Sequence, residues 1–311
     1  MKEYNVIIMV TPEKLPLLKV SCSYLQENLG AKQIYLVANS SLKHDIESMW
    51  NGKMHFLDEE SIMPGLSVKT IKELLVKKCG DGHRAGWFYQ QFLKMAYAMI
   101  CEEEYYLLWD ADTVPLHAME YFNDETPYFI TKREYYAGYF DTIGRLFQDR
   151  VGRLDAKVSY IAENMMIHKG YMQEMIAEIM KNQTLEGETF YQKILDAINP
   201  KLVSYTGFSE FETYGNYMDT IHPGVYKHKK IRTQRLGSFL LGTEPNREQL
   251  EWVARDYDII SFEEHGKQWL KKITQISCVR RCFHAKTMFD VFIELSNLND
   301  RLCGRPYAKI D

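Results

Sequence analysis

Short apolar runs alternate with longer segments of helical periodicity along the first 112 residues. Residues 6–10 form a continuous apolar run rich in β-branched side chains, which is typical of a buried strand. Residues 15–29 repeat apolar side chains at helical spacing, and Gly30 then marks the end of a helix. The alternation continues with strands predicted at 33–37, 53–57 and 105–109, and helices predicted at 42–49, 68–78 and 87–103. This order predicts an α/β fold with a mainly parallel sheet flanked by helices.

The second half of the chain is less regular, and its predicted elements are shorter. A strand is predicted at 128–131, and helices are predicted at 171–180, 189–197 and 247–254. Residues 137–157 contain several glycines and arginines and are interpreted as a loop. Residues 267–283 combine basic side chains with apolar ones at roughly helical spacing, which predicts one basic amphipathic helix. We therefore expect a C-terminal helical extension after the main sheet.

Composition and charge narrow the class of protein. The 311 residues are 46% hydrophobic and 26% charged, as in an ordinary globular protein with a full core. A formal net charge of −4 and the absence of a recognised binding motif argue against a nucleic-acid partner. No apolar run reaches the length of a membrane span, so we expect a cytoplasmic protein. The basic helix leaves open a peripheral contact with the inner face of the cell membrane.

Two aspartates follow the last apolar run of the first half. Residues 105–109 lead straight into Asp110-Ala111-Asp112, and ligands of parallel sheets bind outside the carboxyl ends of the strands. The small Ala111 leaves room for a ligand beside the backbone. Because Mg²⁺ and Mn²⁺ prefer oxygen ligands and often bind carboxylates together with phosphates, this pattern predicts a metal held on a diphosphate. A solvated turn with an aspartate helix cap is the alternative.

Polar side chains near the predicted strand ends are further candidates for binding the nucleotide that carries this diphosphate. Gln90 and Lys94 are four residues apart on the helix before the aspartates, so they share a face. If that face meets the carboxyl edge of the sheet, Lys94 reaches a diphosphate and Gln90 reaches a base or a sugar hydroxyl. A surface helix with these side chains turned to solvent is the alternative. Thr11 and Asn39 follow the first two strands and are included by position alone.

An acidic and aromatic segment at residues 204–218 supplies the candidates for catalysis. Glu210 is the first candidate, and Glu212 the second, for a general base, a carboxylate that takes the proton of a substrate hydroxyl. Tyr214 and Tyr217 are candidates for stacking on sugar rings. The alternative for Glu212 is a capping box at the start of a helix.

Basic side chains gather immediately after this segment. Five Lys or Arg residues lie within residues 227–235, which are interpreted as a clamp for the diphosphate, a site for an anionic lipid headgroup, or a solvated surface. His222 is a candidate third metal ligand, with a purely structural histidine as the alternative. Asp155 and Glu163 are secondary candidates for a carboxylate near the reacting groups.

Three segments stand out together: GWFYQQFLK at 86–94, LLWDADT at 107–113 and FSEFETYGN at 208–216. Their order and spacing resemble the DUF6492 type of bacterial polysaccharide glycosyltransferases, over about residues 4–220. The resemblance implies a GT-A (nucleotide-diphospho-sugar transferase) fold, Mn²⁺ or Mg²⁺ as cofactor, and a nucleotide-sugar donor, with a UDP-sugar favoured. It also implies a glycan or lipid-linked acceptor and a role in capsule or lipopolysaccharide synthesis.

The same resemblance suggests how the chain is divided. Residues 1–225 are interpreted as the catalytic domain, with a nucleotide-sugar half at 1–115 and an acceptor half at 116–225. Residues 226–311 are interpreted as a basic, helical extension. The predicted function is metal-dependent transfer of a sugar from a nucleotide-sugar to a glycan or glycolipid.

Other functions stay open at this point. The segment around Asp110 also fits a phosphohydrolase of the HAD type, in which this aspartate would be the nucleophile. In that class the motif normally follows the first strand, whereas here the strand–helix units of residues 6–103 precede it. A sugar- or nucleotide-binding module without catalytic activity is the remaining alternative.

Overall fold

The computed structural model describes residues 2–49, 52, 54–205, 207–263 and 271–302. The chain forms two compact units that interleave along the sequence. Unit 1 comprises Met1–Pro12, Gly30–Ala111 and Glu120–Lys230, and unit 2 comprises Glu13–Leu29, Asp112–Met119 and Ile231–Asp311. The division at residue 225 into a catalytic domain and an extension stays a prediction.

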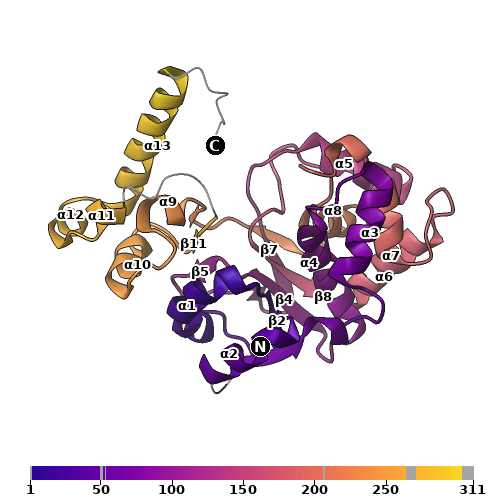
Figure 1. Ribbon diagram of the computed structural model, residues 1–311, viewed down its shortest axis with the longest axis horizontal. Helices are drawn as coiled ribbons and strands as arrows, with labels where there is room; N and C mark the ends of the chain where they lie inside the picture. Colours follow the sequence, from indigo (N-terminus) through magenta and orange to yellow (C-terminus); the bar gives the residue numbers. More distant parts are fainter. Residues whose placement is uncertain (1, 50–51, 53, 206, 264–270, 303–311) are drawn as a thin grey trace. The chain divides into compact units, whose positions relative to one another are not determined.

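A five-stranded sheet forms the centre of unit 1 (Figure 1). Its order is β3 (Met54–Asp58), β2 (Ile34–Ala38), β1 (Tyr4–Met9), β4 (Tyr105–Asp110) and β8 (Asn164–His168). The first four strands are parallel, and only β8 runs antiparallel, beside β4. The predicted mixed α/β fold with a mainly parallel sheet flanked by helices is therefore confirmed.

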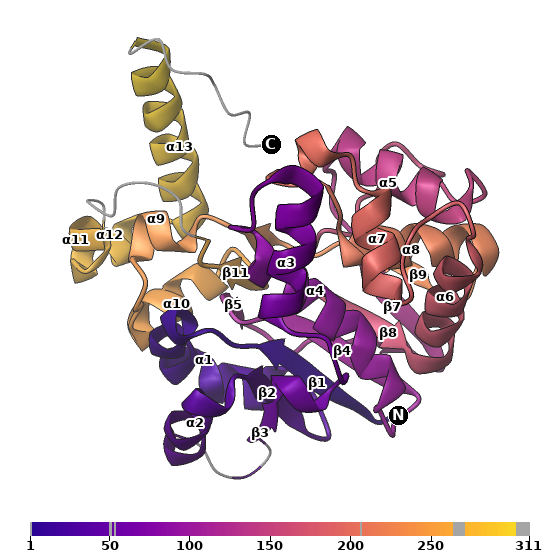
Figure 2. The same cartoon turned by 45° about the vertical axis from the view of Figure 1, so that its right-hand side comes forward.

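The strands at the centre of the sheet are continuous apolar runs because both of their faces are covered by other parts of the chain. Every residue of β1 is buried, and so is every residue of β4 except Asp110 at its end. The helices of unit 1 are α2 (Lys43–Met49), α3 (Val68–Cys79), α4 (Ala85–Ala96), α5 (Ala137–Phe147), α6 (Lys169–Lys181), α7 (Phe190–Ala197) and α8 (Glu210–Ile221). Figure 2 shows α4 beside β1, where it also contacts α3 and α8. A small second sheet joins β6 (Phe122–Asn123), β7 (Thr126–Ile130) and β9 (Lys227–Lys229).

Unit 2 has its own apolar core. It contains α1 (Leu15–Asn28), α9 (Gly237–Leu241), α10 (Arg247–Ala254), α11 (Lys271–Thr274), α12 (Ser277–Cys282), α13 (Ala285–Leu302) and a sheet of β5 (Thr113–Pro115), β11 (Ile259–Ser261) and β10 (Thr233–Gln234). Leu240, Trp252, Ile260 and Phe289 are fully buried at the centre of this core. The indole of Trp252 donates a hydrogen bond of 2.8 Å to the carbonyl of Phe283, so its polar edge is satisfied.

Short 3-10 turns connect several of these elements: η1 (Pro12–Lys14), η2 (Ser40–Leu42), η3 (Glu59–Ser61), η4 (Tyr97–Met99) and η5 (Pro200–Leu202). Among the described residues, no helix is both long enough and apolar enough to cross a membrane.

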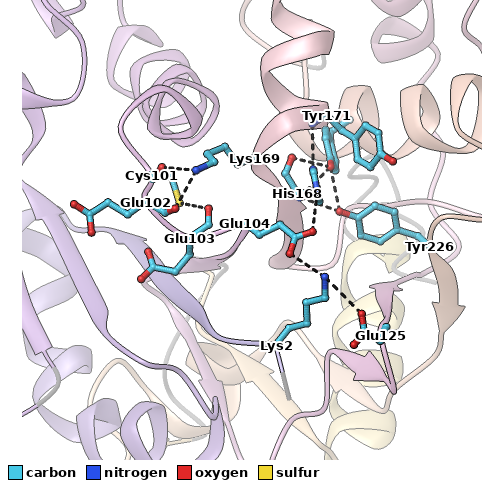
Figure 3. Close-up of polar contacts among 11 residues, drawn as sticks. Lys2, Cys101, Glu102, Glu103, Glu104, Glu125, His168, Lys169, Tyr171 and Tyr226 are labelled. Atoms are coloured by element: carbon cyan, nitrogen blue, oxygen red, sulfur yellow. Dashed lines mark hydrogen bonds and ion pairs between the residues drawn. The ribbon is translucent and has the colours of Figure 1, made fainter.

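Helix α4 ends earlier than the sequence predicts. It stops at Ala96 and continues only as the turn η4, whereas the periodicity extends to residue 103. The ammonium of Lys169 donates bonds of 3.0 Å to the carbonyls of Cys101 and Glu102 (Figure 3). These carbonyls are satisfied from another element, so the chain can leave the helix and enter β4.

Residues 137–157 are not all loop, because they contain α5. The glycines of this segment favoured the prediction of a loop, but the segment forms an amphipathic helix whose buried face includes Tyr139, Ile143 and Phe147. A Cβ on Gly144, near the C-terminus of α5, would lie 2.7 Å from the carboxylate of Asp149, so that side chain would have to move. Glycine inside a helix weakens the sequence signal without preventing the helix.

The prediction of a single basic helix at 267–283 is also wrong for the part that the structure describes. Residues 264–270 lie outside the described residues, and the rest is divided between α11 and α12. Thr274 is buried where α11 ends, and its hydroxyl donates to the carbonyl of Leu240 at 3.0 Å. The guanidinium of Arg280 donates to the carbonyl of Thr274, so this carbonyl needs no helical partner.

Two glycines inside helices give a matched test of the packing. A Cβ on Gly215 of α8 would lie 2.2 Å from the ring of Tyr160, whereas a Cβ on Gly86 of α4 meets nothing within 4 Å. We expect Gly215→Ala to lower the free energy of unfolding by about 3 kcal/mol through overpacking. We expect Gly86→Ala to raise it by about 0.5–1 kcal/mol through helix propensity. Chemical denaturation measures both, and similar changes in the two variants would refute this packing of α8.

Candidate functional site

The carboxyl end of β4 positions Asp110. Asp110 is in register with Met9 of β1, and its backbone N–H donates to the carbonyl of Glu163 at 2.9 Å. Glu163 has a left-handed backbone conformation with φ of 58°, which is uncommon for a residue other than glycine. Its side chain is buried against the ammonium of Lys132, with N–O distances of 2.5 and 2.6 Å. The backbone of Asp110 is thus held between β1 and Glu163, while about a third of its side chain (32%) stays exposed.

Lys94 of α4 connects Asp110 to α8. Its ammonium lies 2.7 Å from a carboxylate oxygen of Asp110 and 2.7 Å from one of Glu210, and it also lies over the ring of Phe211. Burial alone would lower the pKa of Lys94, but the two carboxylates outweigh burial and raise it. The lysine is therefore charged, and the group of two carboxylates and one ammonium carries a net negative charge that favours a cation nearby.

The start of α8 places Glu210 in this group. The hydroxyl of Ser209 accepts the N–H of Glu212 at 3.2 Å and caps the helix. The side-chain oxygen of Gln91 accepts the N–H of Glu210 at 3.1 Å, which ties α8 to α4. The structure thus brings together three residues that the sequence singled out, Lys94, Asp110 and Glu210.

Glu212 is buried and does not form the capping box. It is 1% exposed, and its carboxylate accepts bonds from the hydroxyl of Ser159, the N–H of Tyr160 at 3.2 Å and the amide of Asn216 at 2.9 Å. A carboxylate with these partners anchors the segment that leads to Glu163, so we assign Glu212 a structural role. Burial raises the pKa of Glu212, although the hydrogen bonds oppose this.

Glu212→Gln should change the pH dependence of stability. Because the folded state raises the pKa of Glu212, its contribution to stability is fully present below the unfolded pKa, about 4.3, and is lost as pH rises through the folded pKa. The variant should therefore gain stability relative to the wild type as pH increases from about 4 to about 7. Surface ion pairs lower the pKa of Glu178, so Glu178→Gln should show the opposite trend. Denaturation at several pH values measures both, and parallel curves for Glu212→Gln and wild type would contradict this assignment.

His222 lies at the opposite end of α8 from Glu210. His222 follows Glu210 by twelve positions, which correspond to about 18 Å along the helix axis, so the structure does not bring His222 to Asp110. The imidazole of His222 instead pairs with Glu174 at 3.0 and 3.1 Å. Within the described part of the chain, no three His, Cys, Asp or Glu side chains are grouped as metal ligands.

The tyrosines of the acidic and aromatic segment belong to the core. Tyr214 is fully buried, and its hydroxyl lies 3.1 Å from that of Tyr226. Tyr217 is 1% exposed and donates to Glu174 at 2.9 Å. The prediction that they stack on sugar rings is therefore wrong, because neither ring offers a face to solvent.

The remaining donor-binding candidates have different surroundings. Thr11 follows β1 and is half-buried, and Ala111 is buried directly after Asp110. Asn39 follows β2 and is exposed, where its side chain caps η2 by accepting the N–H of Ser41 at 3.1 Å. Gln90 is half-buried on α4, and its neighbour Gln91 is the glutamine that contacts α8.

Asp112 belongs to unit 2 and has a lysine partner of its own. Its carboxylate lies 3.0 Å from the ammonium of Lys14, and its backbone carbonyl accepts the N–H of Phe262 at 2.7 Å. The side chain is 20% exposed. Both aspartates of the motif are therefore held by lysines, Asp110 by Lys94 and Asp112 by Lys14.

The basic cluster at 227–235 is largely engaged with nearby acidic groups. Lys229 in unit 1 lies over the ring of Tyr128 and 3.8 Å from Glu120. In unit 2, Arg232 pairs with Asp258 and Arg235 pairs with Glu263. Asp155, a secondary candidate, is exposed in a turn where it accepts the N–H of Lys157 at 2.7 Å.

A second polar group lies at the other edge of the sheet, where β1 and β4 begin. Figure 3 shows Lys2 between Glu104, at 2.8 Å, and Glu125, at 3.8 Å, with His168 paired to Glu104 at 3.3 Å. Burial lowers the pKa of His168, against the opposing effect of Glu104. Ligands of parallel sheets bind at the carboxyl edge, so we assign this amino-terminal group to the fold.

Sequence reasoning missed Gln91, which binds the backbone of Glu210, and Lys14, which pairs with Asp112. Gln91 is three residues before Lys94, and this spacing also places two side chains on one helix face. The pattern therefore contained a signal for Gln91, but it did not distinguish Gln91 from Gln90. Lys14 carried no local signal, because its pair with Asp112 depends on tertiary structure.

The chain belongs to DUF6492, which is described as a family of unknown function and whose model matches residues 17–234. The family membership suggested by the three motifs is therefore confirmed. No curated protein sequence matches the chain.

Solved structures of glycosyltransferases are similar to this chain at low identity. Mouse xyloside xylosyltransferase 1 in its apo form has 12% identity over 85% of this chain and 99% of that chain, with a TM-score of 0.42. The galactosyltransferase LgtC with donor and acceptor sugar analogues has 8% identity, coverage of 87% and 94%, and a TM-score of 0.40. The glycosyltransferase GlyE of Streptococcus pneumoniae TIGR4 has 10% identity, coverage of 95% and 64%, and a TM-score of 0.39. Because these scores are below 0.5, the fold assignment rests on the strand order and connections of this chain.

Proposed function

We propose that this chain is a metal-dependent glycosyltransferase of the GT-A type that uses a nucleotide-sugar donor. The observation that carries the proposal is the buried Lys94 between Asp110 and Glu210 at the carboxyl end of β4. This edge of a parallel sheet is where such folds bind nucleotides. A partly exposed carboxylate with a fixed backbone is a suitable ligand for the cation that accompanies a diphosphate.

The residues of the motif fit a divalent metal. Asp110 and Asp112 are two positions apart in the chain, and each keeps part of its carboxylate exposed. One or two carboxylates together with phosphate oxygens and waters are enough to hold Mg²⁺ or Mn²⁺, so a third protein ligand is not required. When bound, the metal would offset the negative charge of the departing nucleoside diphosphate.

In the transfer, the bond between the anomeric carbon and the diphosphate oxygen breaks, and its electron pair leaves with the diphosphate. The acceptor hydroxyl forms the new bond to the anomeric carbon, and its proton passes to solvent water or to the departing diphosphate. Lys94 keeps Asp110 oriented by holding one of its oxygens at 2.7 Å. Glu210 is a positioning residue, because its carboxylate is 6% exposed and is engaged by Lys94. We propose a UDP-sugar as donor and a glycan or lipid-linked acceptor of a bacterial surface polysaccharide.

Calorimetry tests the proposal with UDP, GDP and CMP, each with and without Mn²⁺. We expect one nucleoside diphosphate to bind only with the metal and Asp110→Asn to abolish this binding. If no nucleotide binds and the protein instead releases phosphate from small phosphoesters, glycosyl transfer is refuted. That outcome would favour the phosphohydrolase with Asp110 as nucleophile.

A further inference from the structure

Residues 275–284 of unit 2 expose apolar side chains around helix α12. Ile276 is 50% exposed and Phe283 is 52% exposed, and these two residues flank the helix. Eight residues of this segment are exposed, all except Val279 and Arg280. Figures 1 and 2 both show α11 and α12 at the outer end of unit 2. Apolar side chains that are exposed together in one short segment, and not scattered singly, indicate an interaction surface.

The core of unit 2 anchors this segment. Arg280 is 7% exposed, and its guanidinium donates to the carbonyl of Thr274 and pairs with Glu248. The carbonyl of Phe283 accepts the indole N–H of Trp252 at 2.8 Å. The backbone of the segment is therefore bonded to the rest of unit 2, so the exposure of its apolar side chains is imposed by the fold.

The charge of this part of the chain is positive. Residues 265–289 contain six Lys or Arg residues and no Asp or Glu. Within the described part of this range, acids from other parts of unit 2 pair with Arg280, His284 and Lys286. Arg281 is exposed on α12, and no acid of the described residues pairs with it. Its guanidinium is therefore available to an external anion close in the chain to the exposed apolar side chains.

A lipid bilayer fits this surface better than a second copy of the chain. A stable protein–protein interface takes about 20–30 residues from each partner, whereas this segment supplies eight exposed residues. A bilayer is fluid and requires no shape complementarity. Interfacial segments bind it through apolar side chains that enter the boundary of the acyl chains and through cations that contact anionic headgroups. The absence of acidic residues from 265–289 favours a bilayer that contains anionic lipids.

We propose that α12, with Ile276 and Phe283 at its ends and Arg281 on its surface, docks the protein on an anionic lipid bilayer. The two apolar side chains enter the boundary between headgroups and acyl chains, and the guanidinium binds a lipid phosphate. The inference goes beyond the proposed function, because docking requires neither a nucleotide nor a metal.

Cosedimentation with vesicles tests the docking surface. Vesicles of phosphatidylcholine alone are compared with vesicles of phosphatidylcholine and phosphatidylglycerol. We expect the full chain to bind the mixed vesicles about tenfold or more tightly, with an affinity that falls as salt is raised. Ile276→Ser and Phe283→Ser should each weaken binding by about tenfold, since each removes an apolar side chain that enters the bilayer. Arg281→Gln should weaken binding to the mixed vesicles alone, by about fivefold.

Leu295→Ser is the matched control. Leu295 of α13 is 51% exposed, as much as Ile276 and Phe283 are, but it follows the acidic Glu294. Its replacement removes an equally exposed apolar side chain from the same unit, and it should leave vesicle binding unchanged. Thermal denaturation confirms that each variant is folded. Binding of UDP with Mn²⁺ should be the same in all of these variants, and its absence from the wild type would refute the proposed function without affecting the vesicle result.

Several outcomes would overturn the docking surface. They are no binding to either kind of vesicle, equal binding to both at low salt, or equal losses for Phe283→Ser and Leu295→Ser. Sedimentation velocity without lipid provides a further test. A dimer that Phe283→Ser dissociates would assign the segment to an interface between copies of the chain, and the inference would then be wrong.

Discussion

Replacing Lys94 with methionine should lower the free energy of unfolding by about 3–5 kcal/mol, the largest effect on stability that we expect from one substitution in unit 1. The ammonium lies 2.7 Å from both Asp110 and Glu210, and its removal leaves two carboxylates facing each other without a counter-ion. Glu210 is only 6% exposed, so water cannot replace the lost partner. Chemical denaturation of the wild type and the variant measures the difference.

A second buried lysine provides the control. Lys193 of α7 is 4% exposed, but within the described residues its ammonium donates only to the backbone carbonyls of Asn182 and Leu185. Lys193→Met leaves neutral acceptors unpaired, so we expect a smaller loss of about 1–3 kcal/mol. The double variant Lys94→Met/Glu210→Gln should recover part of the stability, because it removes one of the uncompensated charges. Equal losses for the two single variants, with no recovery in the double variant, would show that Lys94 is not holding two charged groups.

Asp110→Asn should reduce sugar transfer by about a hundredfold to a thousandfold with little change in stability. Lys94 keeps its pair with Glu210 in this variant, so the buried lysine is not left alone. The amide is a poorer metal ligand than the carboxylate, and the charge that balances the diphosphate is then held less well. Initial rates of transfer from a nucleotide-sugar, measured at several Mn²⁺ concentrations, test this expectation.

Asp290→Asn is the matched control for this substitution. Asp290 pairs with Lys286 on the surface of α13, four residues away along the helix. Its replacement should leave the rate unchanged, because such exposed pairs contribute little. A rate for Asp110→Asn within about twofold of the Asp290→Asn rate would remove Asp110 from the mechanism, since a lost metal ligand should cost much more.

The alternation of apolar runs and helical periods was sufficient to predict the parallel part of the sheet. Buried strands such as β1 and β4 are continuous apolar runs, and their order in the chain gives the edge at which Asp110 lies. The antiparallel strand β8 was harder to predict, because it is short and begins with the polar residue Asn164. That residue is buried, where its carbonyl oxygen accepts the hydroxyl of Tyr121 at 3.0 Å, a contact across 43 residues.

The site was predictable only in part, for a similar reason. Asp110 and Lys94 are 16 residues apart, on a strand and on the helix that precedes it in the chain, and this short separation made their proximity predictable. Glu210 is 116 residues beyond Lys94, so composition suggested it as a carboxylate but could not identify its partner. The roles of Glu210 and Glu212 depend on which face of α8 meets α4. In the same way, the face of α4 that meets α8 decides that Gln91, and not Gln90, contacts it. Helical phase of this kind is set by tertiary packing, which a local pattern does not determine.

The location of the metal in a nucleotide complex tests the central claim most directly. Crystals grown with UDP and Mn²⁺ allow anomalous diffraction at the manganese absorption edge to locate the ion. We expect an anomalous peak within about 2.5 Å of a carboxylate oxygen of Asp110, with the diphosphate bound to the same ion. An ordered nucleotide bound elsewhere, with no manganese at Asp110, would contradict it.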